Sequence, residues 1–263
     1  MIVVSHFQRP GLLIGLAIAA LWAAAPAPAR TLDAIKASGS IGLCAHPNSL
    51  PYASKAEELP GFQIELGRAL AKELGVSLTP EWVVIAYQIP RTTCDLVLDM
   101  IVDRTAPPDF GFKLSNPYYR NGVTLAVPRG STVGSFHDLS ASTKVGVQTG
   151  SIVAMKLDQR RIPISIFGTD EDMLAALAAS VVDAAAVTSL TAQYFNHAHP
   201  GNGVTILPLD ESEPDLVWDV AVGMRRPDDK LRDAVNAAID HLRGSGTIAQ
   251  IYARYGIVLQ DPK

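Results

Sequence analysis

The segment Gln148-Thr149-Gly150-Ser151 combines residues that are suited to binding a small anionic group. An apolar strand over residues 144–147 is expected to end here, and a helix is expected to begin at Ile152. The first N–H groups of a helix have no acceptor within the helix, so they favour a carboxylate or another small anion. The hydroxyls of Thr149 and Ser151 add two polar groups. The alternative is that one of these hydroxyls only caps the helix.

A second group of polar and aromatic residues follows the first predicted strand, residues 41–45. His46, Asn48 and Tyr52 lie in the turn and loop after it, where α/β proteins usually place their ligands. Tyr52 offers an aromatic face and a phenol hydroxyl to a small organic solute, although packing at the edge of a lobe would use the same side chain. A lone histidine such as His46 is also common as an ordinary loop residue.

Two further candidates lie near the middle of the chain. Asp99 ends a short apolar strand over residues 95–98. By the same rule it faces the ligand, where it would meet an amine or a cation, or it pairs with Arg104. Tyr119 precedes the strand expected over residues 123–127, and its phenol is suited to the mouth of a binding cleft or to packing at a lobe edge.

The remaining reactive residues give no sign of catalysis. Cys44 and Cys94 are too far apart in the sequence for CxxC chemistry, and the six histidines show no cluster. The two cysteines either form a disulfide or pack as two buried thiols. The sequence has no nucleophile elbow, zincin motif, phosphate-binding loop or paired-cysteine zinc spacing. We therefore expect neither an enzyme nor a bound metal or cofactor.

The composition and the N-terminus indicate an exported protein. The chain has 263 residues and a net charge of −4, which gives no reason to expect a nucleic-acid partner. His6 and Arg9 precede an apolar stretch over about residues 11–25, and Ala27-Pro28-Ala29 supplies small residues for cleavage. This is the layout of a secretory signal peptide over residues 1–29, although a retained membrane anchor is the alternative. We expect a soluble, exported product that begins near residue 30.

The rest of the chain alternates between strands and helices, which predicts parallel α/β sheets. The strand over residues 123–127 follows one α/β unit and precedes another, so we expect it to cross between two lobes. A second apolar segment, residues 218–224, is expected to bring the chain back. The helices that position the candidate residues are expected over residues 62–74, 152–157, 169–179, 189–197, 228–243 and 247–255.

An ordered series of short motifs resembles a known family over nearly the whole mature chain. The series consists of Gly61-Phe62-Gln63-Ile64-Glu65-Leu66, Asp95-Leu96-Val97, Leu114-Ser115-Asn116-Pro117-Tyr118-Tyr119, Val145-Gly146-Val147-Gln148-Thr149-Gly150-Ser151, Val182-Asp183-Ala184 and Arg243-Gly244-Ser245-Gly246-Thr247. It is similar to the family-3 periplasmic solute-binding proteins of ABC importers, of the amino-acid-binding type. No single motif is specific, but the order and the spacing are.

The resemblance implies a two-lobe, type II periplasmic binding protein fold that closes on its ligand like a hinged trap. Each lobe would be a mostly parallel sheet flanked by helices, with two crossing strands. The second lobe, residues 127–221, would be inserted into the first, residues 30–126 plus 222–263. The implied function is that of a monomeric receptor, which delivers a small polar solute, amino-acid-like or a carboxylate, to the permease of an ABC importer.

The sequence departs from the amino-acid binders where they hold their ligand. The family places an arginine a few residues after the third strand, and Arg104 does not match that position. Where the family places an aspartate for the ammonium group, this chain has the uncharged Thr188, which is the candidate ligand-binding residue at that position. The motifs from Cys44 to Tyr52, with Cys94-Asp95 and Pro117-Tyr118-Tyr119-Arg120, are also similar to solute-binding-like partners of quinoprotein methanol or alcohol dehydrogenases. A periplasmic dehydrogenase is therefore the alternative partner.

Overall fold

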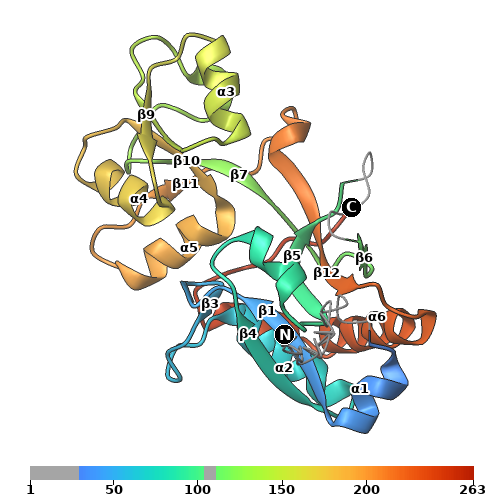
Figure 1. Ribbon diagram of the computed structural model, residues 1–263. Helices are drawn as coiled ribbons and strands as arrows, with labels where there is room; N and C mark the ends of the chain where they lie inside the picture. The colour runs from blue at the N-terminus through green and yellow to red at the C-terminus, as the bar shows by residue number, and fades with distance from the viewer. Residues whose placement is uncertain (1–29, 104–110) are drawn as a thin grey trace, which may run out of the picture.

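The computed structural model describes residues 30–103 and 111–263. The predicted signal peptide, residues 1–29, and Arg104 lie outside the described residues. Two lobes are joined by two long strands, β7 and β12, which run between them (Figure 1). None of the helices in the described ranges is long and apolar enough to span a membrane.

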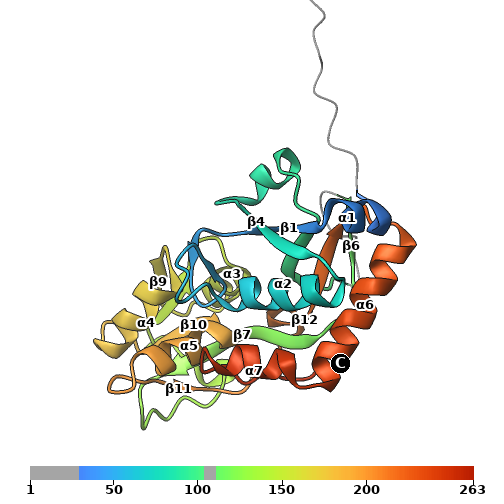
Figure 2. The ribbon, with the colours of Figure 1, turned by 90° about the horizontal axis from the view of Figure 1, so that it is seen from below.

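The first lobe is built from both ends of the described chain. Strand β1 pairs in parallel with β4 on one side and with β5 on the other. Helix α2 contacts both α6 and α7, so the N-terminal and C-terminal segments share one face of the sheet (Figure 2). The elements are α1 (Leu32–Ser38), β1 (Ser40–Ala45), the hairpin β2 (Asn48–Ser49) and β3 (Ala53–Ser54), α2 (Phe62–Glu73), β4 (Ser77–Trp82), β5 (Leu96–Ile101), β6 (Phe112–Leu114), α6 (Asp229–Gly244) and α7 (Thr247–Ala253).

The second lobe lies in the middle of the chain. Strands β10, β8 and β9 lie side by side in this order and are parallel, so their C-terminal ends share one edge of the sheet. Gln148, Phe167 and Thr188 are the last residues of these three strands. The elements are β8 (Val145–Gln148), α3 (Ile152–Gln159), β9 (Ile164–Phe167), α4 (Asp170–Ala178), β10 (Ala184–Thr188), α5 (Ser189–Ala198) and β11 (Thr205–Ile206).

The crossing strands β7 (Tyr119–Val127) and β12 (Val217–Arg225) hold the lobes together. They pair with each other in antiparallel register, from Tyr119 opposite Val220 to Gly122 opposite Val217. Beyond this stretch β7 pairs with β10 and β11, and β12 pairs with β5 and β6. Strand β7 therefore extends into the sheet of the second lobe and β12 into the sheet of the first, and their mutual pairing joins the two sheets in the order β4-β1-β5-β12-β7-β10-β8-β9.

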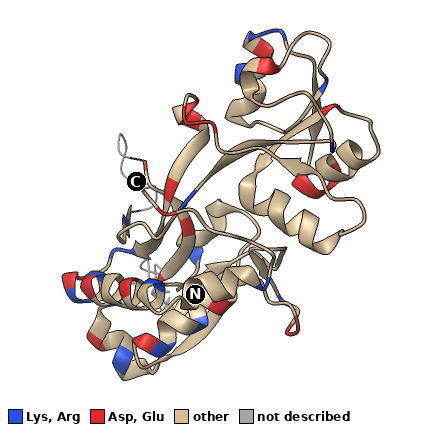
Figure 3. Ribbon diagram, turned by 180° about the vertical axis from the view of Figure 1, so that it is seen from behind, with Lys and Arg blue, Asp and Glu red and all other residues tan. Residues whose placement is uncertain are grey.

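The buried apolar residues form separate cores in the two lobes. The first-lobe core includes Leu66 of α2, Ile239 of α6 and Tyr252 of α7. The second lobe has one core on each face of its sheet, around Val147 and around Met173. Acidic and basic residues recur along α6 (Figure 3), whereas its buried residues are all apolar. Leu190 of α5 belongs to the first-lobe core, so α5 packs against the opposite lobe.

The predicted two-lobe α/β class is confirmed, whereas several local elements differ from the expectation. The loop expected after the first strand contains the hairpin β2–β3, and β6 lies at the end of a stretch expected to be irregular. A 3₁₀ helix, η1 (Ala86–Arg91), occupies a stretch without a clear pattern. The strand β6 is too short to show an apolar pattern in the sequence. It is a strand because it pairs with β12 in the folded protein. The lobe boundaries at residues 126–127 and 221–222 stay predictions.

A disulfide joins Cys44, in β1, to Cys94, which precedes β5; their Cα atoms are 5.4 Å apart. Next to it, Asp95 accepts hydrogen bonds from the Arg30 guanidinium and, at 2.7 Å, from the Gly42 backbone N–H. A covalent and an ionic contact therefore fix the start of β5 against β1.

The pairing of the crossing strands leaves no room for a side chain at position 122. A Cβ atom added at Gly122 would collide with the carbonyl oxygen of Leu216 and lie 3.1 Å from the Cα of Val217. We therefore expect Gly122→Ala to lower the free energy of unfolding by about 1–3 kcal/mol, as overpacking typically does. Urea denaturation measures this. Gly168→Ala is the matched control, because nothing lies within 4 Å of its added Cβ; an equal loss in both variants would contradict the prediction.

Candidate functional site

A carboxylate surrounded by tyrosine hydroxyls lies at the C-terminal end of β5. Oδ1 of Asp99 accepts hydrogen bonds from the hydroxyls of Tyr118 at 2.7 Å, Tyr119 at 2.8 Å and Tyr252 at 3.3 Å. Its Oδ2 accepts a hydrogen bond from Nε2 of Gln63 at 2.7 Å. The backbone of Asp99 has φ = 59°, a left-handed conformation that aspartate tolerates better than most residues. The four donors come from three different segments, so the fold itself assembles this cluster.

Aromatic packing holds these hydroxyls in place. The ring centroids of Tyr118 and Tyr119 are 5.0 Å apart, and those of Tyr119 and Tyr252 are 5.6 Å apart. Phe62 stacks on Tyr252 at 4.3 Å and contacts the ring of Tyr52 at 5.0 Å. Centroid separations in this range are typical of stable aromatic pairs. The apolar interior therefore continues from the Asp99 cluster to Tyr52.

Within the described residues, the side chains that donate hydrogen bonds to the Asp99 carboxylate are all neutral. Burial raises the pKa of the Asp99 carboxyl, and the hydrogen bonds from Tyr118, Gln63, Tyr119 and Tyr252 lower it only in part. Burial also raises the pKa of the three tyrosines well above the usual value, and the nearby carboxylate adds to this. No basic side chain in residues 30–103 or 111–263 perturbs the pKa of Asp99, and Arg104 lies outside them.

Tyr52 brings the first lobe into contact with the second. Its hydroxyl lies 3.4 Å from Oγ1 of Thr188, a long and weak hydrogen bond, and Thr188 Oγ1 is in turn 2.8 Å from Oγ1 of Thr191 in α5. Burial raises the pKa of Tyr52 to about 12, and the charges of Asp99 and Asp170 contribute to the shift. Two carboxylates, one on each lobe, are therefore close enough to Tyr52 to raise its pKa.

Asp170 is the carboxylate on the second lobe. It is half-buried at the first position of α4, just after the C-terminal end of β9. The side chain of Thr191 and the backbone N–H of Thr188 hydrogen-bond to it, and burial raises its pKa. The N-cap of α4 is Thr169, whose hydroxyl accepts a hydrogen bond from the Asp172 N–H, so Asp170 is not needed for capping.

The segment Gln148–Ser151 lies at the same edge of the second-lobe sheet as Thr188. Its hydroxyls are engaged locally: Thr149 donates to the carbonyl of Phe167 at 3.1 Å, and Ser151 caps α3 by accepting from the Ala154 N–H at 3.3 Å. The capping alternative is therefore realised for Ser151. Gln148, Thr149 and Gly150 are exposed, and Gly150 has φ = 69°, so the turn remains open to solvent.

The two other predicted residues take part in the hairpin after β1. Nδ1 of His46 accepts a hydrogen bond from the backbone N–H of Asn48 at 3.1 Å, and Asn48 pairs with Ser54 across the hairpin. These contacts give His46 and Asn48 a local structural role. Of the predicted residues, the structure thus connects Asp99, Tyr119, Tyr52 and Thr188, and leaves His46, Asn48 and Gln148–Ser151 in separate turns.

Sequence reasoning missed Gln63, Tyr252 and Asp170 and gave Tyr118 no part in binding. Gln63 lies in the first turn of α2, a position that could have been weighed as pointing to the ligand. The acidic first turn of α4 gives no specific signal for Asp170, because acidic residues at this position also suit the helix dipole. Tyr252 is 153 residues from Asp99, and no local pattern connects them. No group of His, Cys, Asp or Glu side chains in the described residues could hold a metal ion.

Two α/β lobes joined by antiparallel crossing strands, with polar side chains of both lobes meeting beside them, define the class of hinged binding proteins. A family model places the chain more closely. Residues 40–257 match the bacterial extracellular solute-binding proteins, family 3, and the chain belongs to this family. Proteins of this family bind small polar solutes and deliver them to ABC importers, and they act outside the cytoplasm.

Individual relatives agree with this assignment. The chain is 30% identical over 220 residues to the probable amino-acid-binding protein YxeM of Bacillus subtilis (strain 168), covering 79% of this chain and 80% of that protein. It is 26% identical to a probable histidine-binding protein of Neisseria gonorrhoeae, over 74% of each chain. Among solved structures, an ancestral cationic amino acid solute binding protein superimposes with a TM-score of 0.73 at 23% identity, covering 86% of this chain and 99% of that one.

The half-buried carboxyl of Asp99 gives the stability of the protein a defined pH dependence. Because its pKa is higher in the folded state than in the unfolded chain, at about 3.9, it favours folding at low pH, and this contribution is lost as the pH rises from that value through the folded pKa. Asp99→Asn keeps an acceptor for the tyrosines and does not ionise. We therefore expect the stability of this variant, relative to the native chain, to increase as the pH rises across this interval.

Urea denaturation at a series of pH values measures this difference. Asp233→Asn, which changes an exposed carboxylate on α6, is the control. A stability difference between Asp99→Asn and the native chain that does not change with pH would show that the carboxyl is not held against ionisation.

Proposed function

We propose that this protein captures a small, positively charged, amino-acid-like solute between its lobes and delivers it to an ABC importer. One observation carries the proposal: in the described residues the carboxylates of Asp99 on the first lobe and Asp170 on the second receive hydrogen bonds from neutral groups only, and burial raises the pKa of both. A cationic solute would supply the missing positive charge to both. Membership of the solute-binding family supports the general role.

The surrounding residues suggest how such a solute is held. Tyr118, Tyr119 and Tyr252 fix the orientation of the Asp99 carboxylate, and Gln63 leaves part of Oδ2 free to accept from the solute. The aromatic face of Tyr52 covers the solute, and its hydroxyl meets Thr188 when the lobes approach. A carboxylate on the same solute would lie at the exposed turn Gln148–Ser151, near the N-terminus of α3.

The transport cycle follows from the hinge. The crossing strands β7 and β12 bend as the lobes close, and closure with bound solute produces the form that the permease recognises. In this proposal the chain is exported with the help of residues 1–29, loses them by cleavage, and acts in the periplasm as a monomer.

The alternative function, as a partner of a dehydrogenase, would use a different part of the molecule. It would use the outer surfaces of the lobes, so binding of a quinoprotein methanol or alcohol dehydrogenase would not require Asp99 or Tyr52. Co-purification with such a dehydrogenase, unchanged in Asp99→Asn, would favour this partner over an importer permease. The acidic residues at the lobe boundary favour the receptor.

Calorimetry with the mature chain tests the ligand class. We expect saturable binding of arginine, lysine or histidine, weaker binding of neutral glutamine, and none of glutamate or acetate. Small-angle scattering should show that the chain becomes more compact with the solute that binds. Binding of glutamate or acetate in preference to the cations would overturn the assignment to a cationic solute.

The two carboxylates can be tested separately. We expect Asp99→Asn and Asp170→Asn each to weaken binding of the best cationic amino acid by about 2–5 kcal/mol, the range for removing one partner of a buried charge pair. Asp233→Asn on the exposed face of α6 should leave the affinity unchanged. If the two boundary variants behave like this control, the cation does not bind between Asp99 and Asp170.

A further inference from the structure

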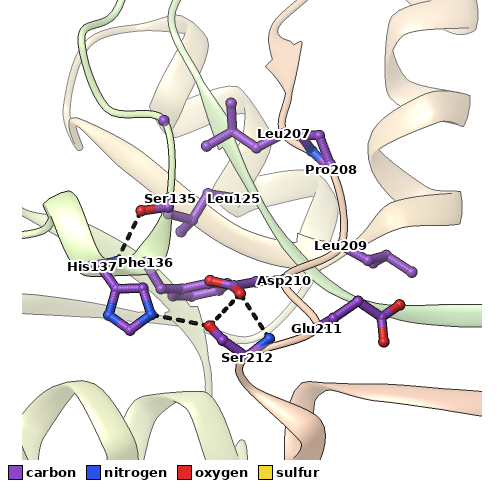
Figure 4. Close-up of a pocket in the computed structure, with 11 residues that line it drawn as sticks. Leu125, Ser135, Phe136, His137, Leu207, Pro208, Leu209, Asp210, Glu211 and Ser212 are labelled. Carbon is purple, nitrogen blue, oxygen red and sulfur yellow. Dashed lines mark hydrogen bonds between the residues drawn. The ribbon is translucent and has the colours of Figure 1, made fainter.

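A pocket in the second lobe lies apart from the lobe boundary and beside the crossing strands. It has a volume of about 390 Å³, within the range of about 300–1,000 Å³ that small-molecule sites occupy. One wall is η3 (Phe136–Asp138), and the other is the segment 207–212 that leads towards β12. Leu125 of β7 also lines it (Figure 4).

Apolar, polar and acidic side chains line this pocket. Its apolar surface comes from Leu125, Phe136 and Leu207, with Phe136 buried beneath the opening. The polar groups include His137, Ser212 and the carboxylate of Asp210, and no lysine or arginine lines the pocket. The pocket therefore combines an aromatic surface with a negative charge, which together suit an organic cation.

Only one oxygen of the Asp210 carboxylate is satisfied. Oδ1 accepts hydrogen bonds from the backbone N–H of Ser212 at 3.0 Å and from its hydroxyl, which also lies 3.0 Å from Nε2 of His137. Oδ2 is buried and has no partner among the described residues. Figure 4 shows this carboxylate between Phe136 and Ser212. Leaving a buried carboxylate oxygen without a hydrogen-bond donor costs free energy. A ligand that donates a hydrogen bond to this oxygen would therefore bind favourably.

We propose that this pocket is a second binding site, for a small organic ammonium ion with an apolar body. The body packs against Phe136 and Leu125, and the ammonium group donates to Asp210, whose side chain rotates slightly to present Oδ2. Neutral and anionic analogues of the same shape bind less well, because they leave the charge of Asp210 unbalanced.

The position of the pocket links it to the hinge. Leu207 donates its N–H to the carbonyl of Leu125 at 2.9 Å and accepts from the hydroxyl of Thr124, both in β7. Glu211 forms an ion pair with Arg120 of β7 at 2.8 Å. A bound ion would therefore hold the segment 207–212 against the crossing strand. This site does not depend on the ligand proposed for the lobe boundary.

Fluorine NMR of 4-fluorobenzylamine with the mature chain tests the proposal. We expect the amine to bind, and 4-fluorobenzyl alcohol and 4-fluorophenylacetate to bind at least about tenfold more weakly, which corresponds to about 1.4 kcal/mol. Saturation transfer from the Phe136 ring to the probe should locate it in this pocket. Equal binding of the three probes, or no transfer from Phe136, would overturn the proposal.

Variants separate this site from the lobe boundary. Asp210→Asn keeps an acceptor for Ser212 and should weaken the amine at least about tenfold, again about 1.4 kcal/mol. Asp215→Asn, a nearby exposed carboxylate outside the pocket, is the matched control and should have no effect. Asp99→Asn should also have no effect. If Asp99→Asn weakens the amine and Asp210→Asn does not, the amine binds between the lobes and the second site is refuted.

Discussion

The Asp99 carboxylate joins segments from distant parts of the chain through hydrogen bonds. Its donors are Gln63 of α2, Tyr118 and Tyr119 at the start of β7, and Tyr252 of α7. These segments come from the N-terminal part, the crossing and the C-terminal part of the chain. Because leaving any one donor unpaired in this buried setting is costly, the cluster favours a single arrangement of the three segments. These hydrogen bonds fix the N-terminal end of the crossing strand β7 to the first lobe.

The same carboxylate also bears on the movement of the lobes. Asp170 lies across the boundary, and Tyr52 senses both charges. If closure brings the two carboxylates closer as water leaves, their repulsion increases, since it grows as the dielectric constant falls. A cation between them would reverse the sign of this term. A ligand shifts a conformational equilibrium only by its differential affinity for the two states, and here the difference would come from this change of sign.

The sequence predicted the lobes much better than it predicted the site. Strands β8 and β10 are short, continuous apolar runs and helices α2 and α6 have clear apolar periodicity, so their existence and order followed from the apolar pattern alone. Asp99 could be placed at a strand end, where parallel sheets gather their ligands, and Thr188 at the position where the family has an aspartate. Tyr252 could not be connected to Asp99, because only the tertiary fold brings α7 beside β5. The hydroxyl of Ser151 had two possible uses, and local geometry decides for the helix cap.

The two aspartates of β5 and its flank show why Asp99 stands out as the binding residue. Asp95, just before the strand, is 4% exposed and is neutralised by Arg30, while the Gly42 N–H satisfies Oδ2 at 2.7 Å. The negative charge of Asp95 is therefore paired within the chain, where it helps to hold β5 against β1. Asp99, five positions from the disulfide cysteine Cys94, receives four hydrogen bonds, all from neutral groups of the described chain. Neutral donors stabilise a carboxylate without cancelling its charge, so Asp99 retains a negative potential that a positively charged solute can satisfy.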